Sequence, residues 1–590
     1  MANQKLTDRV LSTGVTLNDL IHIVIPTDPT DDPAGSSYKA TVGQMMDTIS
    51  ASTIMVIGVG TGSTERCSNS NSAYGDYSTV SGGYLNTSSG CLSTISGGYG
   101  NTSSGCLSTI GGGLGNLTGP TGVILTLSSY TSGAGLGLAD LTYGPYSQTT
   151  TSGYGVGADF TFDVSGNTIT GVTITNGGIN YVGGDTIFIT GTTFPGGTSS
   201  NDVTLTISNV LVSIYNTIGG GYCNTSSGYY STVSGGYRNT SSCGGSTIGG
   251  GYRNTSSGYS STVGGGYFNT SSDYYSTVSG GYYNTSSDYY STVGGGANNE
   301  SSGCYSTVSG GRQNTSSCYD STVSGGFCNT STDSNSTVGG GRYNISSSCN
   351  STVGGGECNT ILTGSTSSTI GGGLCNTILT GTTNSTISGG YRNTSSGYNS
   401  TIGGGYKNTS SGYSSTLGGG CCNTSSGNYS TLSGGYGNTS VGYSSTLSGG
   451  LSNTSSGNSS TVGGGTCNMS SGNNSTIGGG TCNKTLTGAT NSTIGGGTCN
   501  TILTGSTSST IGGGYRNTSS CLYSSILGGS GNTVTHDCSF IVGNGIATSC
   551  PNTTYMNCLS IMNLPSSSVG LCSGSLWYDS SAGCVIKYVP

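Results

Sequence analysis

The chain has 590 residues, of which 113 are glycine and only 6% are charged, whereas roughly a quarter of an ordinary soluble domain is charged. Its 13 Lys and Arg and 21 Asp and Glu give a net charge of −8 without a basic run, which argues against nucleic acid as a partner. No apolar stretch approaches the ~20 residues that span a bilayer, and the opening residues lack a secretory signal pattern. We therefore expect no membrane insertion.

Residues 1–60 differ in composition from the rest of the chain and are expected to form a separate N-terminal segment. The segment holds the acidic residues Asp28, Asp31 and Asp32. Its local pattern predicts a strand at residues 20–25 and a short helix near residues 42–49.

A 15-residue repeat dominates the chain, with the consensus S-T-V-S/G-G-G-Y-x-N-T-S-S-G-x-x. The two halves of this unit resemble each other, so each half is expected to be one short strand and its turn. Gly, Ser, Thr and Asn fill the copies and no 3.6-residue apolar stripe exists, which excludes a helix. The sequence therefore predicts an all-β, parallel β-solenoid with about 15-residue rungs stacked about 4.8 Å apart.

The tolerance of each repeat position predicts the direction in which its side chain faces. The third position is almost always aliphatic and is expected to face inward, whereas the variable eighth position is expected to face solvent. Asn at the ninth position is expected to form an amide ladder along the stack, and Gly at the fifth, sixth and thirteenth positions to permit corners. The residues singled out for this core are Val233, Ile248, Val263, Val278, Asn239, Asn254, Asn269 and Asn284.

The repeat is interrupted once and ends before the C-terminus, which predicts five regions. Residues 61–116 are expected to be the first rungs and residues 214–538 the main stack. Between them, residues 117–213 alternate apolar and polar residues, for example in Asp159–Val164, and are expected to form an inserted small β-domain. Residues 539–590 are expected to cap the last rung, because an open strand edge would polymerise. Four copies are two residues longer, and that insertion is expected to lie in a loop.

One chain buries little apolar surface per rung. Ordering 15 residues costs on the order of 15–30 kcal/mol of backbone entropy, whereas one buried Val or Ile returns about 1.5–3 kcal/mol. Other contacts must supply the difference, and we expect neighbouring chains to provide a second buried face in a homotrimer.

Catalytic and metal-binding patterns are absent from the sequence. The two histidines, His22 and His536, lie in no nucleophile or metal motif, and the repeats carry no Asp at a constant position for calcium. We expect no enzymatic activity, no cofactor and no metal. The 22 cysteines form no CxxC pair; outward free thiols are favoured, although stacking would also bring some Cys pairs within disulfide range.

Tyrosine is the surface feature with most functional promise. Tyrosines at the last two repeat positions should line one edge of the stack, where their rings would contact sugars or proteins or only brace a thin roll. Basic pairs at the eighth position could meet acidic glycans or be solvated decoration. The candidate surface residues are Tyr229, Tyr230, Tyr259, Tyr274, Tyr275, Tyr289, Tyr290, Arg238, Arg253 and, near the C-terminus, Trp577.

Repeat units such as Ser261–Tyr275 resemble the left-handed β-roll heads of trimeric autotransporter adhesins and the related repeats of bacteriophage tail fibres. The segment Asp19–Val24 followed by Gly35–Val42 resembles the opening of phage fibre and collar proteins. Residues 564–570 and 574–578 are similar to the terminal segment of phage virion proteins, and residues 178–187 to a β-module of phage structural proteins. The sequence departs from the bacterial adhesins in lacking their signal peptide, heptad stalk and membrane anchor, which favours the viral branch.

The resemblance implies a homotrimeric structural fibre of a virus particle, a tailed-phage tail or collar fibre. Residues 1–60 would bind other virion proteins, and the stack would give reach and adhesion to a host-surface glycan or protein. An alternative is a structural subunit of a bacterial extracellular filament or a surface adhesin, located on the cell surface or in the extracellular matrix.

Overall fold

The computed structural model describes the rungs almost completely and the flanking segments in part. The acidic cluster and the helix expected near residues 42–49 lie outside the described residues, whereas the expected strand at residues 20–25 is present as β1 (Leu20–Ile25), antiparallel to β2 (Ser36–Thr41). The described residues are 20–25, 36–41, 55–66, 70–119, 123–132, 140–152, 156–166, 168–179, 181, 184–194, 202–211, 214–562, 564–579 and 585–590.

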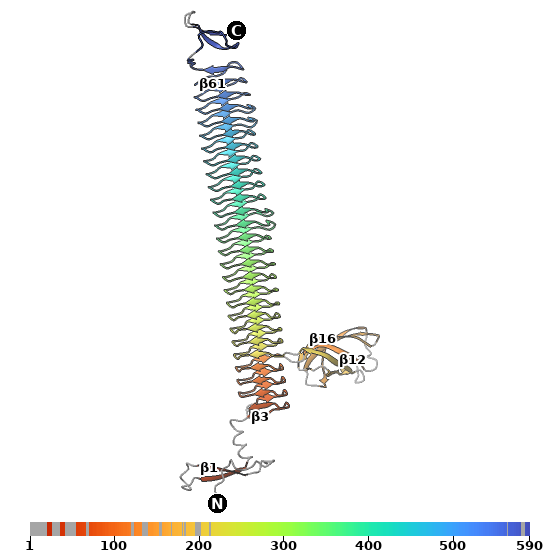
Figure 1. Cartoon of the computed structure of the whole chain (residues 1–590). Coiled ribbons are helices and arrows are strands. Elements are labelled where there is room, and N and C mark those ends of the chain that lie inside the picture. Colours follow the sequence, from red (N-terminus) through yellow and green to blue (C-terminus); the bar gives the residue numbers. More distant parts are fainter. Residues whose placement is uncertain are drawn as a thin grey trace. The chain divides into compact units, whose positions relative to one another are not determined.

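The prediction of an all-β, parallel β-solenoid is confirmed. The chain divides into two compact units, residues 1–327 and 328–590, and in both of them each repeat forms one coil with two short strands (Figure 1). In the first unit, for example, β25 (Thr262–Val263) pairs in parallel with β23 (Thr247–Ile248) before it and β27 (Thr277–Val278) after it. Residues 15 positions apart in the sequence therefore pair in neighbouring strands, so the repeat length sets the register of the sheet. The left-handed sense of the coil stays a prediction.

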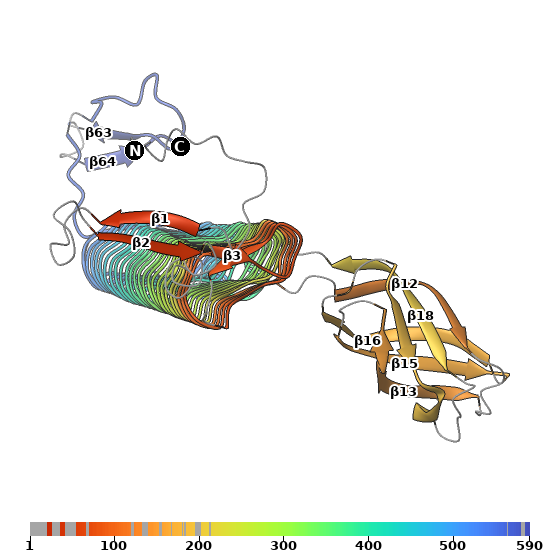
Figure 2. The same cartoon turned by 90° about the horizontal axis from the view of Figure 1, so that it is seen from below.

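The strands of the first unit form two parallel series, and the coils nearly superpose when viewed along the stack (Figure 2, red to green). Strands at repeat positions two and three are β4 (Thr64–Arg66), β6 (Thr79–Val80), β8 (Thr94–Ile95), β10 (Thr109–Ile110), β19 (Thr217–Ile218), β21 (Thr232–Val233), β23, β25, β27, β29 (Thr292–Val293), β31 (Thr307–Val308) and β33 (Thr322–Val323). Strands at positions ten and eleven are β5 (Ser72–Ala73), β7 (Thr87–Ser88), β9 (Thr102–Ser103), β11 (Leu117–Thr118), β20 (Thr225–Ser226), β22 (Thr240–Ser241), β24 (Thr255–Ser256), β26 (Thr270–Ser271), β28 (Thr285–Ser286), β30 (Glu300–Ser301) and β32 (Thr315–Ser316).

The coil interior is half polar. The aliphatic third residue of each coil is fully buried, and so are Ser at positions one and eleven and Asn at position nine. The two serines bond to each other, as between the Oγ atoms of Ser256 and Ser261, 2.7 Å apart. Paired hydroxyls can be buried at little net cost, so a typical coil closes around a narrow core with one aliphatic side chain. Four of the described coils bury a second one at position eleven, namely Ile361, Ile378, Ile502 and Val534.

The stack begins with a coil that the repeat signature does not reveal. Residues 63–66 and 70–77 belong to this coil, although Glu65 occupies the third position and its Oε2 accepts a 2.6 Å hydrogen bond from the backbone N–H of Ala73. The preceding strand β3 (Met55–Ile57) pairs with β4 in the antiparallel sense. An antiparallel strand thus covers the N-terminal edge of this parallel sheet.

The interruption of the repeat leaves the coil register unchanged. Strand β10 pairs with β19 and β11 pairs with β20, which are the strands on the two sides of residues 120–213. Residues 123–211 themselves form two antiparallel sheets around an aromatic and aliphatic cluster that includes Phe160, Phe162 and Leu205. Their elements are β12 (Val123–Ser132), β13 (Leu141–Ser147), β14 (Thr150–Thr151), β15 (Val156–Ser165), β16 (Thr168–Ile179), β17 (Thr186–Ile189), the short 3-10 helix η2 (Gly191–Thr193) and β18 (Val203–Leu211).

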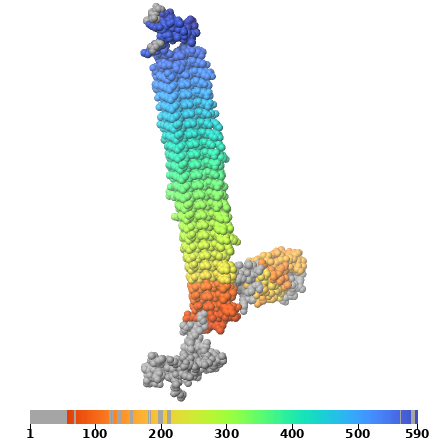
Figure 3. All heavy atoms as spheres, in the orientation of Figure 1, coloured from red at the N-terminus to blue at the C-terminus, as the bar shows by residue number. Residues whose placement is uncertain are grey.

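The second unit repeats the same coil, and its surface shows regular ridges (Figure 3, green to blue). Positions two and three form β35 (Thr337–Val338), β37 (Thr352–Val353), β39 (Thr369–Ile370), β41 (Thr386–Ile387), β43 (Thr401–Ile402), β45 (Thr416–Leu417), β47 (Thr431–Leu432), β49 (Thr446–Leu447), β51 (Thr461–Val462), β53 (Thr476–Ile477), β55 (Thr493–Ile494), β57 (Thr510–Ile511) and β59 (Ser525–Ile526). Positions ten and eleven form β34 (Thr330–Ser331), β36 (Ile345–Ser346), β38 (Thr360–Ile361), β40 (Thr377–Ile378), β42 (Thr394–Ser395), β44 (Thr409–Ser410), β46 (Thr424–Ser425), β48 (Thr439–Ser440), β50 (Thr454–Ser455), β52 (Met469–Ser470), β54 (Lys484–Thr485), β56 (Thr501–Ile502), β58 (Thr518–Ser519) and β60 (Thr533–Val534).

The longer copies keep the register of this unit, because their extra residues lie between strands. Val353 pairs with Ile370, 17 residues later, and Ile370 pairs with Ile387. The parallel sheet also continues past residue 538, through β61 (Phe540–Val542) and β62 (Thr554–Met556), although the repeat signature has ended there. The last elements are the antiparallel pair β63 (Leu576–Asp579) and β64 (Val585–Tyr588).

Candidate functional site

The residues predicted for the core lie inside the coils. Val233, Ile248, Val263 and Val278 have no exposed surface, and neither have Asn239, Asn254, Asn269 and Asn284. The asparagines stack in register, and in these four coils their hydrogen bonds run to the backbone. The expected amide-to-amide bonds occur in other coils, for example from Asn101 Nδ2 to Asn86 Oδ1 at 3.1 Å and from Asn376 Nδ2 to Asn359 Oδ1 at 3.1 Å. Asn254 Oδ1 accepts from the backbone N–H of Asn269 at 2.9 Å, and Asn254 Nδ2 donates to the carbonyls of Gly250 at 2.8 Å and Gly266 at 3.0 Å.

This pattern explains why Asn is required at the ninth position. The side chain joins its own coil to the next one: it pairs the Asn269 amide and the Gly250 carbonyl, and it gives the Gly266 carbonyl a second bond beside the one from the Tyr252 N–H at 2.8 Å. The neighbouring Gly251, at position six, has φ +88°, and a Cβ there would lie 2.1 Å from the Gly266 carbonyl oxygen. The corner glycine and the buried asparagine therefore act together to connect successive coils.

Two further corners carry side chains in the left-handed region. At position eight, Arg238 and Arg253 both have φ +52°, and at position fifteen Tyr230 and Tyr275 have φ +58° and +56°. For a residue with a Cβ this conformation costs roughly 1–2 kcal/mol. The sequence shows these positions only as variable, because many residue types share the same strained backbone.

The predicted tyrosines line the corner formed by the last positions. Rings at position fifteen stack on each other, as for Tyr275 and Tyr290, whose centroids are 4.7 Å apart with planes at 10°. Rings at position fourteen meet them edge-on, as for Tyr289 and Tyr290 at 4.5 Å and 89°. All the predicted tyrosines are exposed, with exposed fractions of 38–54%, and these are Tyr229, Tyr230, Tyr259, Tyr274, Tyr275, Tyr289 and Tyr290.

A second tyrosine row runs along position seven, and the sequence analysis did not select it. Tyr222, Tyr237, Tyr252, Tyr267 and Tyr282 stack in succession, with centroid distances of 4.9, 4.7, 4.6 and 5.3 Å and nearly parallel planes. Partial burial raises the pKa of Tyr267, so the phenol stays protonated at neutral pH. The signal was present in the sequence, since Tyr is the consensus residue after the glycine run.

The predicted arginines lie beside this row. The guanidinium carbon of Arg238 is 5.3 Å from the Tyr237 ring centroid, and that of Arg253 is 5.5 Å from Tyr252 and 5.4 Å from Phe268. Such distances are typical of cation–π contacts.

The second unit shows the same arrangement at Arg392 over Tyr391 and Lys407 over Tyr406, both at 5.0 Å. A side-chain hydrogen bond with Tyr406 raises the pKa of Lys407, which keeps its ammonium group protonated.

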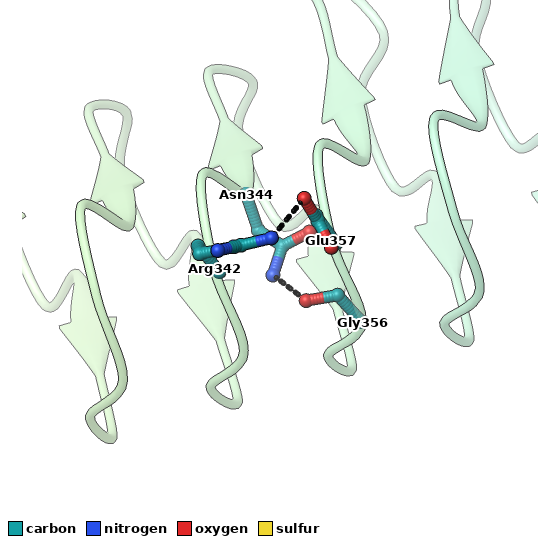
Figure 4. Close-up of polar contacts among 4 residues, drawn as sticks. All are labelled: Arg342, Asn344, Gly356 and Glu357. Carbon is teal, nitrogen blue, oxygen red and sulfur yellow. Dashed lines mark hydrogen bonds and ion pairs between the residues drawn. The ribbon is translucent and has the colours of Figure 1, made fainter.

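One cation of the position-seven row is neutralised by the next coil. Figure 4 shows Arg342 beside Glu357, whose Oε1 lies 2.5 Å from the guanidinium, and below them Asn344 donating to the Gly356 carbonyl at 2.9 Å. Hydrogen bonding to Glu357 raises the pKa of Arg342. Both side chains remain accessible to solvent, which screens the pair, so it contributes little to stability.

Trp577 lies apart from these rows, in the β63–β64 pair. The Nζ atom of Lys587 is 5.6 Å from its ring centroid and 2.6 Å from Asp579 Oδ2. The indole is half-buried under this lysine, so the structure does not bring it together with the tyrosines.

The cysteines within the described ranges are free thiols. Partial burial, with a hydrogen bond to Cys106, raises the pKa of Cys91 to about 11, and a hydrogen bond to Asp288 raises that of Cys304. Raised pKa values keep these thiols protonated, and a protonated thiol is a poor nucleophile.

Other chemistry-bearing groups are dispersed. In the described part of the chain no three His, Cys, Asp or Glu side chains gather in a way that could hold a metal ion. His536 Nδ1 contacts only hydroxyls, 3.1 Å from Thr535 and 3.2 Å from Thr548. An open depression on the inserted sheets is lined by Thr126–Tyr130 and Val172–Ile174. None of the helices among the described residues has the length and apolar character needed to cross a membrane.

Comparison with known proteins gives no relative for this chain. No family model matches the sequence, and no curated protein matches it. The candidate surface therefore rests on the rows of exposed side chains alone.

Proposed function

We propose that this chain is the repetitive structural part of a virus fibre, which gives reach and adheres to a host surface. The observation that carries the proposal is the strict register of the coils: each exposed position recurs at every rung, so weak contacts are repeated many times along one line. Repetition of this kind raises avidity without a strong single site. The sequence resemblance to phage tail fibres supports a tailed-phage tail or collar fibre.

The proposed assembly is a homotrimer whose residues 1–60 bind virion proteins. Its support is the narrow core, in which most coils bury one aliphatic side chain together with Ser and Asn. Large aromatic side chains remain half-exposed on the coil corners, including Tyr274 at 54% and Tyr282 at 48%. Burial of such rings against a neighbouring chain would add apolar area that a single chain lacks.

Immunogold electron microscopy tests the location. Antibodies raised against residues 214–327 should label fibres on virus particles released from the source cells. Labelling of cell-surface filaments without particles would overturn the viral assignment in favour of the bacterial alternative. Light scattering of the intact native protein tests the assembly: a mass three times that of the chain is expected, and the mass of one chain would refute the trimer.

A further inference from the structure

The charged side chains of the coils are separated between two corners. Between residues 214 and 538 every Lys and Arg except Lys484 occupies repeat position seven or eight, which we term the basic corner. Every Asp in the same range occupies positions thirteen to fifteen, the opposite turn of the coil. Of the two Glu, Glu300 lies at position ten, and Glu357 lies at position seven, in the basic corner itself, where it pairs with Arg342. The cations of the basic corner are Arg238, Arg253, Arg312, Arg342, Arg392, Lys407 and Arg516.

Most of this positive charge is left for a partner. Within the described ranges the only carboxylate ion pairs are Arg342 with Glu357 and Lys587 with Asp579. Arg238, Arg392 and Lys407 are exposed, and each lies over the tyrosine that precedes it. The ring restricts the long side chain before any ligand arrives, which lowers the entropy that binding would otherwise cost.

The tyrosines of the basic corner present hydroxyl groups and ring edges rather than ring faces. In the run from Tyr222 to Tyr282 each inner ring has a neighbouring ring stacked on both faces, with planes at 2–11° to one another. A sugar therefore cannot stack on these faces as it does on an isolated aromatic ring. The corner instead offers a row of hydroxyls beside guanidinium or ammonium groups, which suits ligands that are rich in hydroxyls and carry anionic groups.

We propose that the basic corner binds an acidic polysaccharide, laid along the stack. The proposal rests on the host-adhesion function proposed above, and it deepens that function by naming the ligand class. Rungs repeat about every 4.8 Å along the stack, a spacing close to the length of one sugar ring in an extended polysaccharide. Two pairs of adjacent coils carry the same combination of tyrosine and cation: Arg238 with Arg253 in the first unit and Arg392 with Lys407 in the second.

The sparse spacing of the cations favours a polysaccharide over nucleic acid. Duplex DNA carries one negative charge per about 1.7 Å of its axis, so a groove that follows it needs a cation at nearly every rung. After Arg253, the next cation of the basic corner is Arg312, in the fourth coil further on. A polymer with one carboxylate or sulfate every few sugars matches this interval better.

The experiment measures binding of the full-length chain to dextran sulfate of low substitution, to polygalacturonate with most of its carboxylates methyl-esterified, and to unmodified dextran, at low and physiological salt. We expect both anionic polymers to bind, dextran not to bind, and affinity to fall as salt rises. Arg238→Gln/Arg253→Gln and Arg392→Gln/Lys407→Gln should each weaken binding about tenfold, since each removes two charge contacts of the basic corner. Lys484→Gln is the matched control, because Lys484 is an exposed cation at position ten. It should bind like the parent chain.

Circular dichroism and hydrogen exchange must show intact coils in each variant. Equal binding of dextran and dextran sulfate, equal loss in the Lys484→Gln control, or stronger binding of duplex DNA than of both acidic polysaccharides would overturn the proposal. If the polymers do not bind while immunogold labels fibres on particles, the ligand class is wrong and the fibre function stands. If they bind while particles are unlabelled, the fibre function fails and the binding surface stands.

Discussion

The interiors of the coils and of the inserted sheets are stabilised by different interactions. The sheets of residues 123–211 close around a cluster of large apolar side chains, among them Phe160, Phe162 and Tyr181. A typical 15-residue coil encloses one aliphatic residue, two serines and an asparagine, and its remaining stability comes from hydrogen bonds between successive coils. The sheets therefore depend on side-chain volume, whereas the coils depend on backbone approach and on complete pairing of buried polar groups. Substitutions in the two regions should therefore reduce the stability of the protein for different physical reasons.

The largest effect is expected from a methyl group at a coil corner. A Cβ on Gly311, where φ is +85°, would lie 2.2 Å from the Gly326 carbonyl oxygen and 2.6 Å from Asn314 Nδ2. Gly311→Ala should destabilise the surrounding coils by more than about 4 kcal/mol, measured as local loss of hydrogen-exchange protection. Gly310→Ala is the control, because a Cβ there meets no atom within 4 Å. Equal protection in the two variants would contradict the role given to backbone approach.

Removal of a large ring should affect the sheets almost as strongly. Phe162 is fully buried and packs edge-on against Phe194, with ring centroids 5.5 Å apart. Phe162→Ala should cost about 3–5 kcal/mol and expose residues 123–211 to exchange, while the coils keep their protection. The comparison variant is Phe188→Ala, since Phe188 is 40% exposed. Simultaneous unfolding of the coils would show that the two regions are not energetically separate.

Loss of a buried asparagine should be somewhat milder. Asn254→Ala leaves the Asn269 amide and the Gly250 carbonyl without these partners, whereas the Gly266 carbonyl keeps its bond from the Tyr252 N–H. At about 1 kcal/mol for each lost partner, a loss of about 2 kcal/mol is expected in denaturant unfolding. Ser242→Ala, at an exposed site, should stay within about 0.5 kcal/mol. If Asn254→Ala were equally neutral, the asparagine row would not hold the coils together.

The smallest effect concerns alkaline pH. Burial raises the pKa of Tyr181 to about 12, compared with about 10 in an unfolded chain. The protonated phenol is thus favoured by folding, so this stabilisation is complete below pH 10 and is lost as the pH rises towards 12. By pH 11 the inserted sheets should lose about 1.4 kcal/mol from this group, and Tyr181→Phe should remove that part of the pH dependence. Thermal unfolding of both proteins at pH 9 and 11 measures the difference.

The coil was predictable from the sequence because the length of the repeat equals the sequence separation between residues that pair in successive coils. Val263 pairs with Val278, 15 residues away, as the spacing of the repeated aliphatic residue requires. Two coils do not carry the repeat motif that identifies the others. These are the first coil, in which Glu65 replaces the aliphatic residue, and the coil after residue 538, where the motif has ended. A fold imposed by neighbouring coils tolerates such departures, and a pattern search does not see them.

The candidate surface was only partly predictable. Exposure of the last-position tyrosines follows from their place in the repeat, but the stacking of Tyr222 with Tyr237 depends on ring orientation, which the sequence does not contain. The left-handed backbone at Arg253 is likewise hidden, because variability at a position carries no information about φ. The separation of acidic and basic corners becomes visible only when each residue is assigned to its turn of the coil.

In-register pairing also has a genetic consequence. Each coil bonds to the coil before it and the coil after it, and β39 in a longer copy pairs as readily with β37 as strands of ordinary copies do. Duplication or deletion of one coding unit would therefore add or remove one coil while recreating only junctions of a kind that already exist in the molecule. Recombination between near-identical units can change copy number without passing through a misfolded intermediate sequence.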